Sequence, residues 1–482
     1  MSHDWISTVG RRRPYVGIGC AVSTVVLSAL LLMTTALPAS AANCGTAVLS
    51  VTQARAAAEY VRTQVRNAHY FSRLNLADPP INQLSLLSKS ITAPITSALL
   101  AHRLDIALAS AGDGHLRLEL APDVAAGCDA LSITLGWTED GLLVLSGSEV
   151  PAGARIVSIG NRSLDDLEAL AIAAIPHENV YWVHSSFARQ IVRADTLAAF
   201  GIADPDGSVE IAYRTVTGDA ARVRLQPSRP ATPTRAWIGY ELYEADSTGL
   251  FWLQRCDPND EFFATLAAFI RAVKEHNLHK VVIDLRGNPG GDSSVALAVL
   301  RSLGLSIARG FSVDVRVSTE LLSDMPMFAP STVAGAFRAA GLPGPASAAK
   351  RYTIPGSMVL RLLTQRLGDR PFELVSDRKL YVLIDGGTFS SAALFATLVR
   401  DNHLGTLVGE PTGNAITFNG SEIQRPIPGM PYVLHISTAR LLRPEESAGP
   451  APALLPDLRA PQTASALRAG RDAAMELIRQ RL

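Results

Sequence analysis

The sequence predicts an α/β protein whose C-terminal half contains a largely parallel sheet. Short apolar runs at Val281–Ile283 and Leu380–Ile384 are typical of buried strands, and helix-like stretches lie at Glu261–Asn277 and Ser391–Val399. Strands that alternate with helices in this way indicate a parallel sheet covered by helices. A β-rich region of short strands from 131 to 230 precedes this half, and a helical region precedes the β-rich one.

The helical region lies between residues 46 and 110, where apolar residues recur at steps of three and four. It ends at the turn Gly112-Asp113-Gly114. His115 and the alternating Leu116, Leu118 and Leu120 follow, a pattern that predicts a strand.

In the β-rich region, Gly153–Asn161 reads as a strand ending in a turn, and Leu164–Ile175 reads as a helix. This order resembles a PDZ-like module, although the long insert Pro176–Gly201 is not typical of one. A generic small β-rich domain is the alternative. Pro227, Pro230 and Pro233 predict a rigid linker. We therefore expect domains at 42–128, 129–232 and 233–482, the last ending in an amphipathic helix over 465–482.

The first 41 residues have the pattern of an export signal. Arg11-Arg12-Arg13 precedes an uncharged stretch from 14 to 42, and Ala39-Ser40-Ala41 is a small-x-small cleavage pattern. The start faintly resembles a twin-arginine signal. We expect an exported protein, periplasmic, extracytoplasmic or secreted, with an uncleaved membrane anchor as the alternative. Export permits a disulfide, and the expected pair is Cys44–Cys128.

The composition of the chain bears on its partners. The 482 residues have a net charge of zero and only 18% charged residues, which does not favour nucleic acid or an anionic membrane surface. No C-x-x-C pair or histidine cluster has zinc spacing, so we expect neither a metal nor a cofactor.

Ser390 is the best candidate nucleophile. It lies in Gly386-Gly387-Thr-Phe-Ser390-Ser-Ala-Ala, between a strand-like run and a helix-like stretch, where backbone N–H groups are free. A second glycine-rich turn, Asp284–Gly291, follows another apolar run. Two such turns can build one oxyanion site, from the N–H of Ser391 and that of Gly290 or Gly291. Ser391 is the rival nucleophile.

A serine hydroxyl needs a base, either a lysine or a histidine supported by a carboxylate. No lysine follows Ser390 in the sequence. His115 is the best of the histidines, because the turn before it constrains its backbone.

The two glycine-rich turns and Val408-Gly-Glu-Pro-Thr-Gly413 together resemble the tail-specific (C-terminal-processing) serine protease family over roughly residues 235–460. The resemblance implies a crotonase-like core and an endopeptidase that cuts unfolded or C-terminal polypeptide. One branch of that family uses a Ser–Lys dyad, but the position of its lysine is occupied here by Gly413-Asn414-Ala415. The departure fits the tricorn-like branch, which implies a triad of Ser390, His115 and a glutamate.

The branch's Glu-x-x-Gly pattern favours Glu446 over Glu445 as that glutamate, and the family suggests a supporting role for Asp401. A non-catalytic peptide-binding scaffold on the same fold is the alternative function, and another hydrolase such as an esterase is a third. The substrate and the oligomeric state do not follow from the sequence.

Overall fold

The computed structural model describes residues 44–71, 78–229, 235–368, 372–445, 447, 449 and 451–481. The predicted export signal at 1–41 lies outside the described residues, as do Glu446 and the linker residues Pro230 and Pro233.

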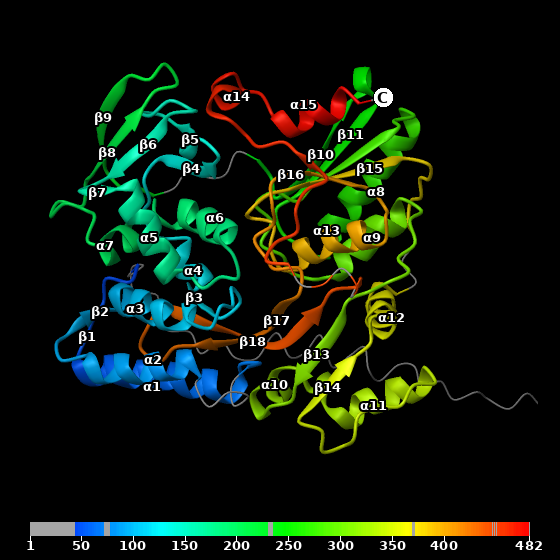
Figure 1. Ribbon diagram of the computed structural model, residues 1–482, viewed down its shortest axis with the longest axis horizontal. Helices are drawn as coiled ribbons and strands as arrows, with labels where there is room; N and C mark the ends of the chain where they lie inside the picture. Colours follow the sequence, from blue (N-terminus) through cyan, green and yellow to red (C-terminus); the bar gives the residue numbers. More distant parts are fainter. Residues whose placement is uncertain are drawn as a thin grey trace, which may run out of the picture. The chain divides into compact units, whose positions relative to one another are not determined.

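The N-terminal region is helical, as its apolar spacing predicts (Figure 1). The side chain of Ser50 accepts the N–H of Gln53, whose side chain accepts the N–H of Ser50, and this capping box starts the first helix. Apolar side chains of the three long helices share one buried cluster with the first β-strand after the His115 turn. The elements are β1 (Val48–Leu49), α1 (Val51–Ala68), α2 (Pro79–Ser90), β2 (Ile95–Thr96), α3 (Ser97–Ala109), β3 (Arg117–Leu120) and α4 (Pro122–Ala125).

The β-rich region forms a sheet in the order β4-β5-β6-β8-β9, with β7 paired to β6. Helices α5 and α6 pack against it, and α6 lies beside β4 at the edge of the sheet. The expected insert 176–201 is therefore helical. The elements are β4 (Ile133–Thr138), β5 (Gly141–Gly147), β6 (Arg155–Ile159), β7 (Arg162–Ser163), α5 (Leu164–Ala174), α6 (Val180–Gln190), α7 (Ala194–Ala199), β8 (Val209–Arg214) and β9 (Ala220–Leu225).

The C-terminal half contains a sheet in the order β10-β11-β12-β15-β16-β19. All neighbouring strands are parallel except β10 and β11, so the predicted α/β layer is confirmed. The elements are β10 (Ile238–Tyr243), β11 (Thr248–Leu253), α8 (Asp260–Glu275), β12 (Lys280–Asp284), α9 (Ser294–Ser302), β15 (Lys379–Ile384), α13 (Ser391–Asp401), β16 (Thr406–Gly409) and β19 (Leu458–Arg459).

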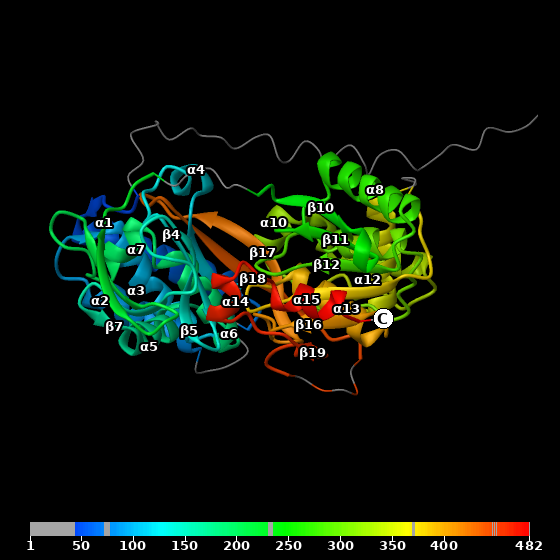
Figure 2. The ribbon, with the colours of Figure 1, turned by 90° about the horizontal axis from the view of Figure 1, so that it is seen from above.

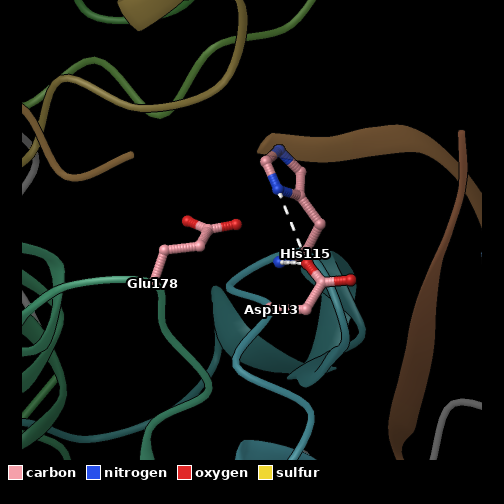
Figure 3. Close-up of side chains that lie close together, drawn as sticks. All are labelled: Asp113, His115 and Glu178. Carbon is pink, nitrogen blue, oxygen red and sulfur yellow. Dashed lines mark hydrogen bonds and ion pairs between the residues drawn. The ribbon is translucent and has the colours of Figure 1, made fainter. Parts of the chain in front are cut away.

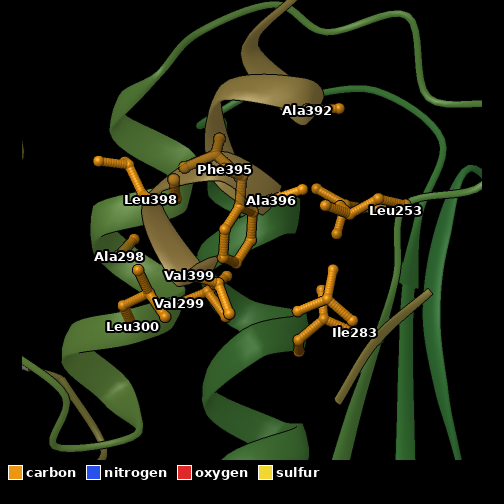
Figure 4. Packing of buried hydrophobic residues seen from close by; sticks show 14 of the residues in the cluster. Leu253, Ile283, Ala298, Val299, Leu300, Ala392, Phe395, Ala396, Leu398 and Val399 are labelled. Carbon is orange, nitrogen blue, oxygen red and sulfur yellow. The ribbon is translucent and has the colours of Figure 1, made fainter. Parts of the chain in front are cut away.

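Both faces of this sheet are covered, which explains why its strands read as continuous apolar runs. Val281 and Ile283 face α8, α9 and α13, whereas Val282 between them faces the C-terminal helix α15 (Ala473–Arg479). Figure 4 shows how α13 packs through Phe395 and Val399 against α9 and the strands. The start of α13, where Ser390 lies, is thus held in place by the buried apolar core.

A second sheet, antiparallel and not predicted from the sequence, joins the two halves of the chain. Its order is β14-β13-β18-β17, and β3 also pairs with β18. In this way the strand after His115 is attached to the C-terminal half (Figures 1 and 2). The remaining elements are β13 (Ser312–Arg316), α10 (Thr319–Asp324), α11 (Pro330–Ala339), β14 (Arg351–Ile354), α12 (Gly356–Leu367), β17 (Phe418–Pro426), β18 (Tyr432–Leu442) and α14 (Ala464–Arg468).

The expected single C-terminal helix over 465–482 is wrong. The segment forms the two short helices α14 and α15, separated at Gly470, which has a φ of +64° that ends a right-handed helix. Within the described parts of the chain, no helix combines the length and the apolar character needed to span a bilayer.

The predicted Cys44–Cys128 disulfide is present, and it closes a sequence separation of 84 residues. Because a cross-link of this span restricts the unfolded chain, its loss is expected to lower the free energy of unfolding by about 2–4 kcal/mol. Denaturant titration of the oxidised and reduced protein measures this difference. In the Cys44→Ser/Cys128→Ser double variant, reductant should have no further effect. Equal stability of the oxidised and reduced wild type would contradict the prediction.

Candidate active site

Ser390 occupies a strained backbone position at the start of α13. Its φ of +52° and ψ of −125° lie in a region that residues other than glycine rarely adopt. Its side chain does not cap the helix, and its hydroxyl makes no hydrogen bond to a described residue. A sharp strand-to-helix turn of this kind presents a serine hydroxyl outward, as a nucleophile requires.

The two glycine-rich turns are bonded to each other. The N–H of Phe389 donates to the carbonyl of Asn288 at 2.9 Å, and the hydroxyl of Thr388 donates to the carbonyl of Leu285 at 2.9 Å. The carboxylate of Asp385 accepts the N–H groups of Gly287 and Gly387 at 2.8 and 2.9 Å. These contacts hold the predicted oxyanion residues beside Ser390.

The backbone N–H groups expected at the oxyanion site differ in whether they already donate a hydrogen bond. The N–H of Gly290 donates to the side chain of Asn288 at 2.8 Å, so this donor is occupied. The N–H groups of Gly291 and Ser391 make no hydrogen bond to a described residue. Of the two glycines expected at the oxyanion site, Gly291 is therefore the one with a free donor.

Gly290 contributes through its lack of a side chain instead. An added Cβ would lie 2.6 Å from the Cβ of Ser390 and 2.8 Å from the nitrogen of Ser391, at a φ of +102°. We expect Gly290→Ala to fold but to lose about 10²-fold in kcat/KM, because displacing a nucleophile by an ångström has this cost. Steady-state hydrolysis measures the loss.

Gly287→Ala is the matched control for this prediction. Gly287 lies in the same turn at a φ of +70°, but its added Cβ would meet no atom within 4 Å. It carries the backbone strain without the collision. Equal losses of activity in the two variants would mean that contact with Ser390 is unimportant.

Ser391, the rival nucleophile, is engaged by its neighbours. Its hydroxyl donates to the carbonyl of Gly291 at 2.6 Å and lies 2.9 Å from the hydroxyl of Ser293. Its side chain is also buried. The surroundings therefore favour Ser390, whose hydroxyl is free, for attack on a substrate.

His115 lies in a network built around the buried carboxylate of Asp113. One oxygen of Asp113 accepts the N–H of His115 at 2.8 Å, and the other accepts from Nε2 of His69 at 2.9 Å and from the hydroxyl of Ser437. Burial by itself raises the pKa of Asp113, but these partners lower the pKa to about 2. The ionised carboxylate thus fixes the turn that carries His115.

The ring of His115 is only 2% exposed and is stacked between two aromatic rings. Its centroid lies 4.4 Å from that of Phe389 and 5.5 Å from that of Phe418. Burial lowers the pKa of His115, and the charges of Glu422 and Asp113 partly oppose this. Nδ1 lies 4.0 Å from an oxygen of Asp113, and neither ring nitrogen has a hydrogen-bond partner among the described residues.

Sequence reasoning missed Glu178 and Asn414. Asn414 lies in the stretch Gly413-Asn414-Ala415, and its side-chain oxygen accepts the N–H of Ser390. Its side-chain nitrogen donates to Glu178 at 3.0 Å. The departure from the lysine motif drew attention to the stretch 413–415 without giving Asn414 a role, and nothing in the insert pointed to Glu178.

Figure 3 shows the carboxyl group of Glu178 turned toward His115 and Asp113. One donor atom of each residue lies within 4.8 Å of the others, which makes them the described residues that come nearest to a metal site. However, both oxygens of Asp113 are already used in hydrogen bonds. The cluster fits hydrogen-bonded support of His115 better than a metal centre.

Asp401 anchors the segment that leads to Glu446. Its buried carboxylate pairs with Arg443 at 2.8 and 2.9 Å and accepts the N–H of Glu445 at 3.1 Å. Glu445 itself contacts Arg309 and Ser447 rather than His115. Because Asp401 ends the helix that Ser390 begins, it connects the predicted glutamate segment to the nucleophile helix.

One cavity is lined by Glu178, and a second is lined by the two glycine-rich turns. The first, of about 330 Å³, lies beside Glu178, Phe418 and Arg440. The other, of about 1140 Å³, is lined by β4, by α6 and by the carboxyl ends of β12, β15 and β16, and it includes Gly287 and Gly387 of the two turns.

Comparison with known proteins gives one family and one fold. Residues 259–459 match the model of peptidase family S41, within the 235–460 stretch of the predicted resemblance. No curated protein sequence matches the chain.

Among solved structures, mature CPAF has a TM-score of 0.59 at 14% identity, over 89% of this chain and 96% of CPAF. Mature CPAF complexed with lactacystin gives the same TM-score and identity, over 89% of this chain and 97% of that one. The photosystem II D1 C-terminal processing protease has a TM-score of 0.44 at 14% identity, over 89% and 96% of the two chains. At 14% identity, the likeness to CPAF concerns the fold. On the match of residues 259–459 to the model of peptidase family S41, together with its fold, the protein is a serine peptidase.

Proposed function

We propose that the protein is an exported endopeptidase that hydrolyses unfolded or C-terminal polypeptide with Ser390, His115 and Glu446. The observation that carries the proposal is the positive φ of Ser390 at the start of α13, where its side chain does not cap the helix. Such strain persists only where surrounding structure enforces it, and it concentrates at functional sites.

In the proposed mechanism, Ser390 Oγ attacks the scissile carbonyl carbon while His115 accepts its proton. The oxyanion of the tetrahedral intermediate accepts hydrogen bonds from the free N–H groups of Ser391 and Gly291. His115 then donates the proton to the leaving amine, and water hydrolyses the acyl-enzyme by the same steps. Hydrogen bonds between a nucleophile and its base are often long in unliganded enzymes and tighten with substrate.

Glu446 is proposed as the residue that orients His115. The contacts of Asp401 with Arg443 and Glu445 fix the segment that leads to it, and Glu445 is already paired with Arg309. The tricorn-like pattern adds support. Glu446 lies outside the described residues, so this role rests on the sequence and on its neighbours.

The larger cavity supports a polypeptide substrate. Strand β4 stands at the edge of its sheet and lines the cavity with Thr134 and Gly136. A free strand edge can accept an extended peptide through backbone hydrogen bonds. The same cavity is continuous with Gly287 and Gly387, so a bound chain would lie next to the glycine-rich turns.

Export is supported by the Cys44–Cys128 disulfide, because disulfides persist mainly in oxidising compartments. Cys44 lies just after the predicted cleavage site. Cell fractionation, together with the N-terminal sequence of the mature chain, tests this part. A mature protein that retains residues 1–41 in the cytosolic fraction would contradict export.

A serine-reactive fluorophosphonate probe tests the catalytic part, combined with mass spectrometry of the products from an unfolded protein. We expect labelling at Ser390 and internal fragments. Labelling at another residue would refute the nucleophile. Stepwise release of single amino acids would refute endopeptidase action. Comparing peptides with free and amidated C-termini then shows whether the carboxylate end is recognised.

A further inference from the structure

Glu178 lies on a segment of the β-rich region that is firmly attached to the catalytic half. The side chain of the next residue, Asn179, donates to the carbonyls of Thr412 and Pro452 at 3.2 and 2.7 Å. Trp182, in the first turn of α6, stacks on Phe389 at 3.9 Å between ring centroids. The position of Glu178 relative to the nucleophile turn is thus set on both sides.

One carboxyl group connects the two ends of the proposed dyad. Glu178 Oε2 accepts Nδ2 of Asn414, whose Oδ1 accepts the N–H of Ser390. Gly114, the residue before His115, also lies close to this carboxyl group, because a Cβ added to Gly114 would be 3.5 Å from Glu178 Oε2. Glu178 therefore lies beside the His115 turn and is connected to the Ser390 turn through one amide.

The direction of these hydrogen bonds depends on the acceptor at position 178. A side-chain amide has a donor end and an acceptor end, which can exchange by a half-turn. The N–H of Ser390 requires the oxygen of Asn414, and this orientation turns the NH₂ group toward Glu178. Without an acceptor there, the NH₂ group can rotate toward the N–H of Ser390, which would place two donors opposite each other.

We propose that Glu178 is a positioning residue, which keeps the Ser390 turn in its strained conformation and holds the His115 turn beside it. The inference rests on the proposed roles of Ser390 and His115. The carboxyl group of Glu178 is hydrogen-bonded to Asn414 and lies beside the His115 turn. Glu178 thus acts on catalysis through other residues.

The raised pKa of Glu178 suggests which substitution should be conservative. Burial raises the pKa of Glu178 well above its ordinary value, and the neighbouring Asp113 charge raises it further, against the hydrogen bond from Asn414. These surroundings therefore disfavour the charged form of the carboxyl group. Glutamine has the same length, keeps an acceptor oxygen and carries no charge, so Glu178→Gln should preserve the arrangement.

The test compares Glu178→Gln with Glu178→Ala. We expect Glu178→Gln to keep kcat within about threefold of wild type and Glu178→Ala to lose about 10²-fold, mostly in kcat, with a parallel loss in fluorophosphonate labelling of Ser390. Glu210→Ala removes a carboxylate from β8 of the same region, where its partner is the exposed Arg222, and should change neither. Wild-type kcat in a folded Glu178→Ala would overturn the proposal.

A readout without catalysis separates this proposal from that of the nucleophile. Hydrogen exchange of the Ser390 amide should become faster in Glu178→Ala and in Asn414→Ala, and should remain slow in Glu178→Gln. Unchanged exchange in Glu178→Ala refutes the positioning role whether or not the enzyme is active. If the probe never labels Ser390 in the wild type but the Ser390 amide still exchanges faster in Glu178→Ala, the proposed nucleophile is refuted. The contact from Glu178 to the Ser390 turn is then retained. Asn414→Ala supplies the same comparison if Glu178→Ala does not fold.

Discussion

Replacement of Ser390 by alanine is expected to reduce kcat by on the order of 10⁶-fold, as loss of the nucleophile does in a serine peptidase. Alanine retains the Cβ and has the same backbone strain at a φ of +52°, so the midpoint of thermal unfolding should stay close to that of wild type. The N–H groups of Ser391 and Gly291 are untouched. Binding of an unfolded polypeptide should therefore persist in the inactive variant. Hydrolysis, probe labelling and calorimetry measure the three parts of this expectation.

Ser391→Ala is the control one residue away. The Ser391 hydroxyl bonds Gly291 and Ser293, so its removal should cost stability of about 1 kcal/mol and only a few-fold in activity. The two variants together distinguish attack by Ser390 from attack by its neighbour. Loss of all labelling in Ser391→Ala, with labelling retained in Ser390→Ala, would reverse the assignment.

Local patterns were enough to predict much of the catalytic half. The apolar runs of β12 and β15 are buried on both faces. Each is followed by glycines that predict a tight turn. The placement of Ser390 at the start of α13 follows from the same pattern. These features depend on residues that are neighbours in the chain, which is why the sequence alone was sufficient.

The sheet that joins the two halves could not be predicted in the same way. Strand β18 pairs with β3, so His435 lies opposite Arg117 across more than 300 residues of sequence. No local pattern specifies such a partner. In the C-terminal segment, a local pattern gave a wrong prediction. Its apolar spacing favoured one helix, but a turn at Gly470 divides the segment into α14 and α15.

The support of the candidate site was hidden for a related reason. His69 reads as one more polar residue near the end of a helix, yet its Nε2 lies 2.9 Å from Asp113. Glu178 lies in an insert without a motif, yet it contacts Asn414. Each pairing requires a particular three-dimensional approach of segments, whereas the predicted residues Ser390 and His115 each stand in a turn that can be read locally.

His115→Ala is expected to have an effect similar to that of Ser390→Ala, because the nucleophile and its base act as a unit whose single losses are not additive. The pH profile distinguishes a base from a structural histidine. Only the neutral ring can accept the Ser390 proton, so the rate should rise with pH. Burial lowers the pKa of His115, and the midpoint should therefore lie below the ordinary value of about 6.5.

The same shift has a consequence for stability with a fixed sign. The unfolded chain binds a proton at His115 at higher pH than the folded chain does, so the free energy of unfolding should fall as the pH drops below about 6.5. The His115→Ala variant should lack this contribution, and its slope should be smaller. Measurement of kcat/KM and of denaturant unfolding between pH 4.5 and 8 tests both.

His102→Ala is the matched control, because His102 in α3 also has a pKa that burial lowers, here to about 4. Its ring meets Phe200, which lies outside the candidate site, edge to face. This variant should keep the rising limb of the rate profile. If His115→Ala retains a tenth of the wild-type rate, or if the wild-type rate is flat from pH 4.5 to 7, His115 is not the base. The stacking of its ring on Phe389 would then be a packing contact that supports the turn of Ser390 without taking its proton.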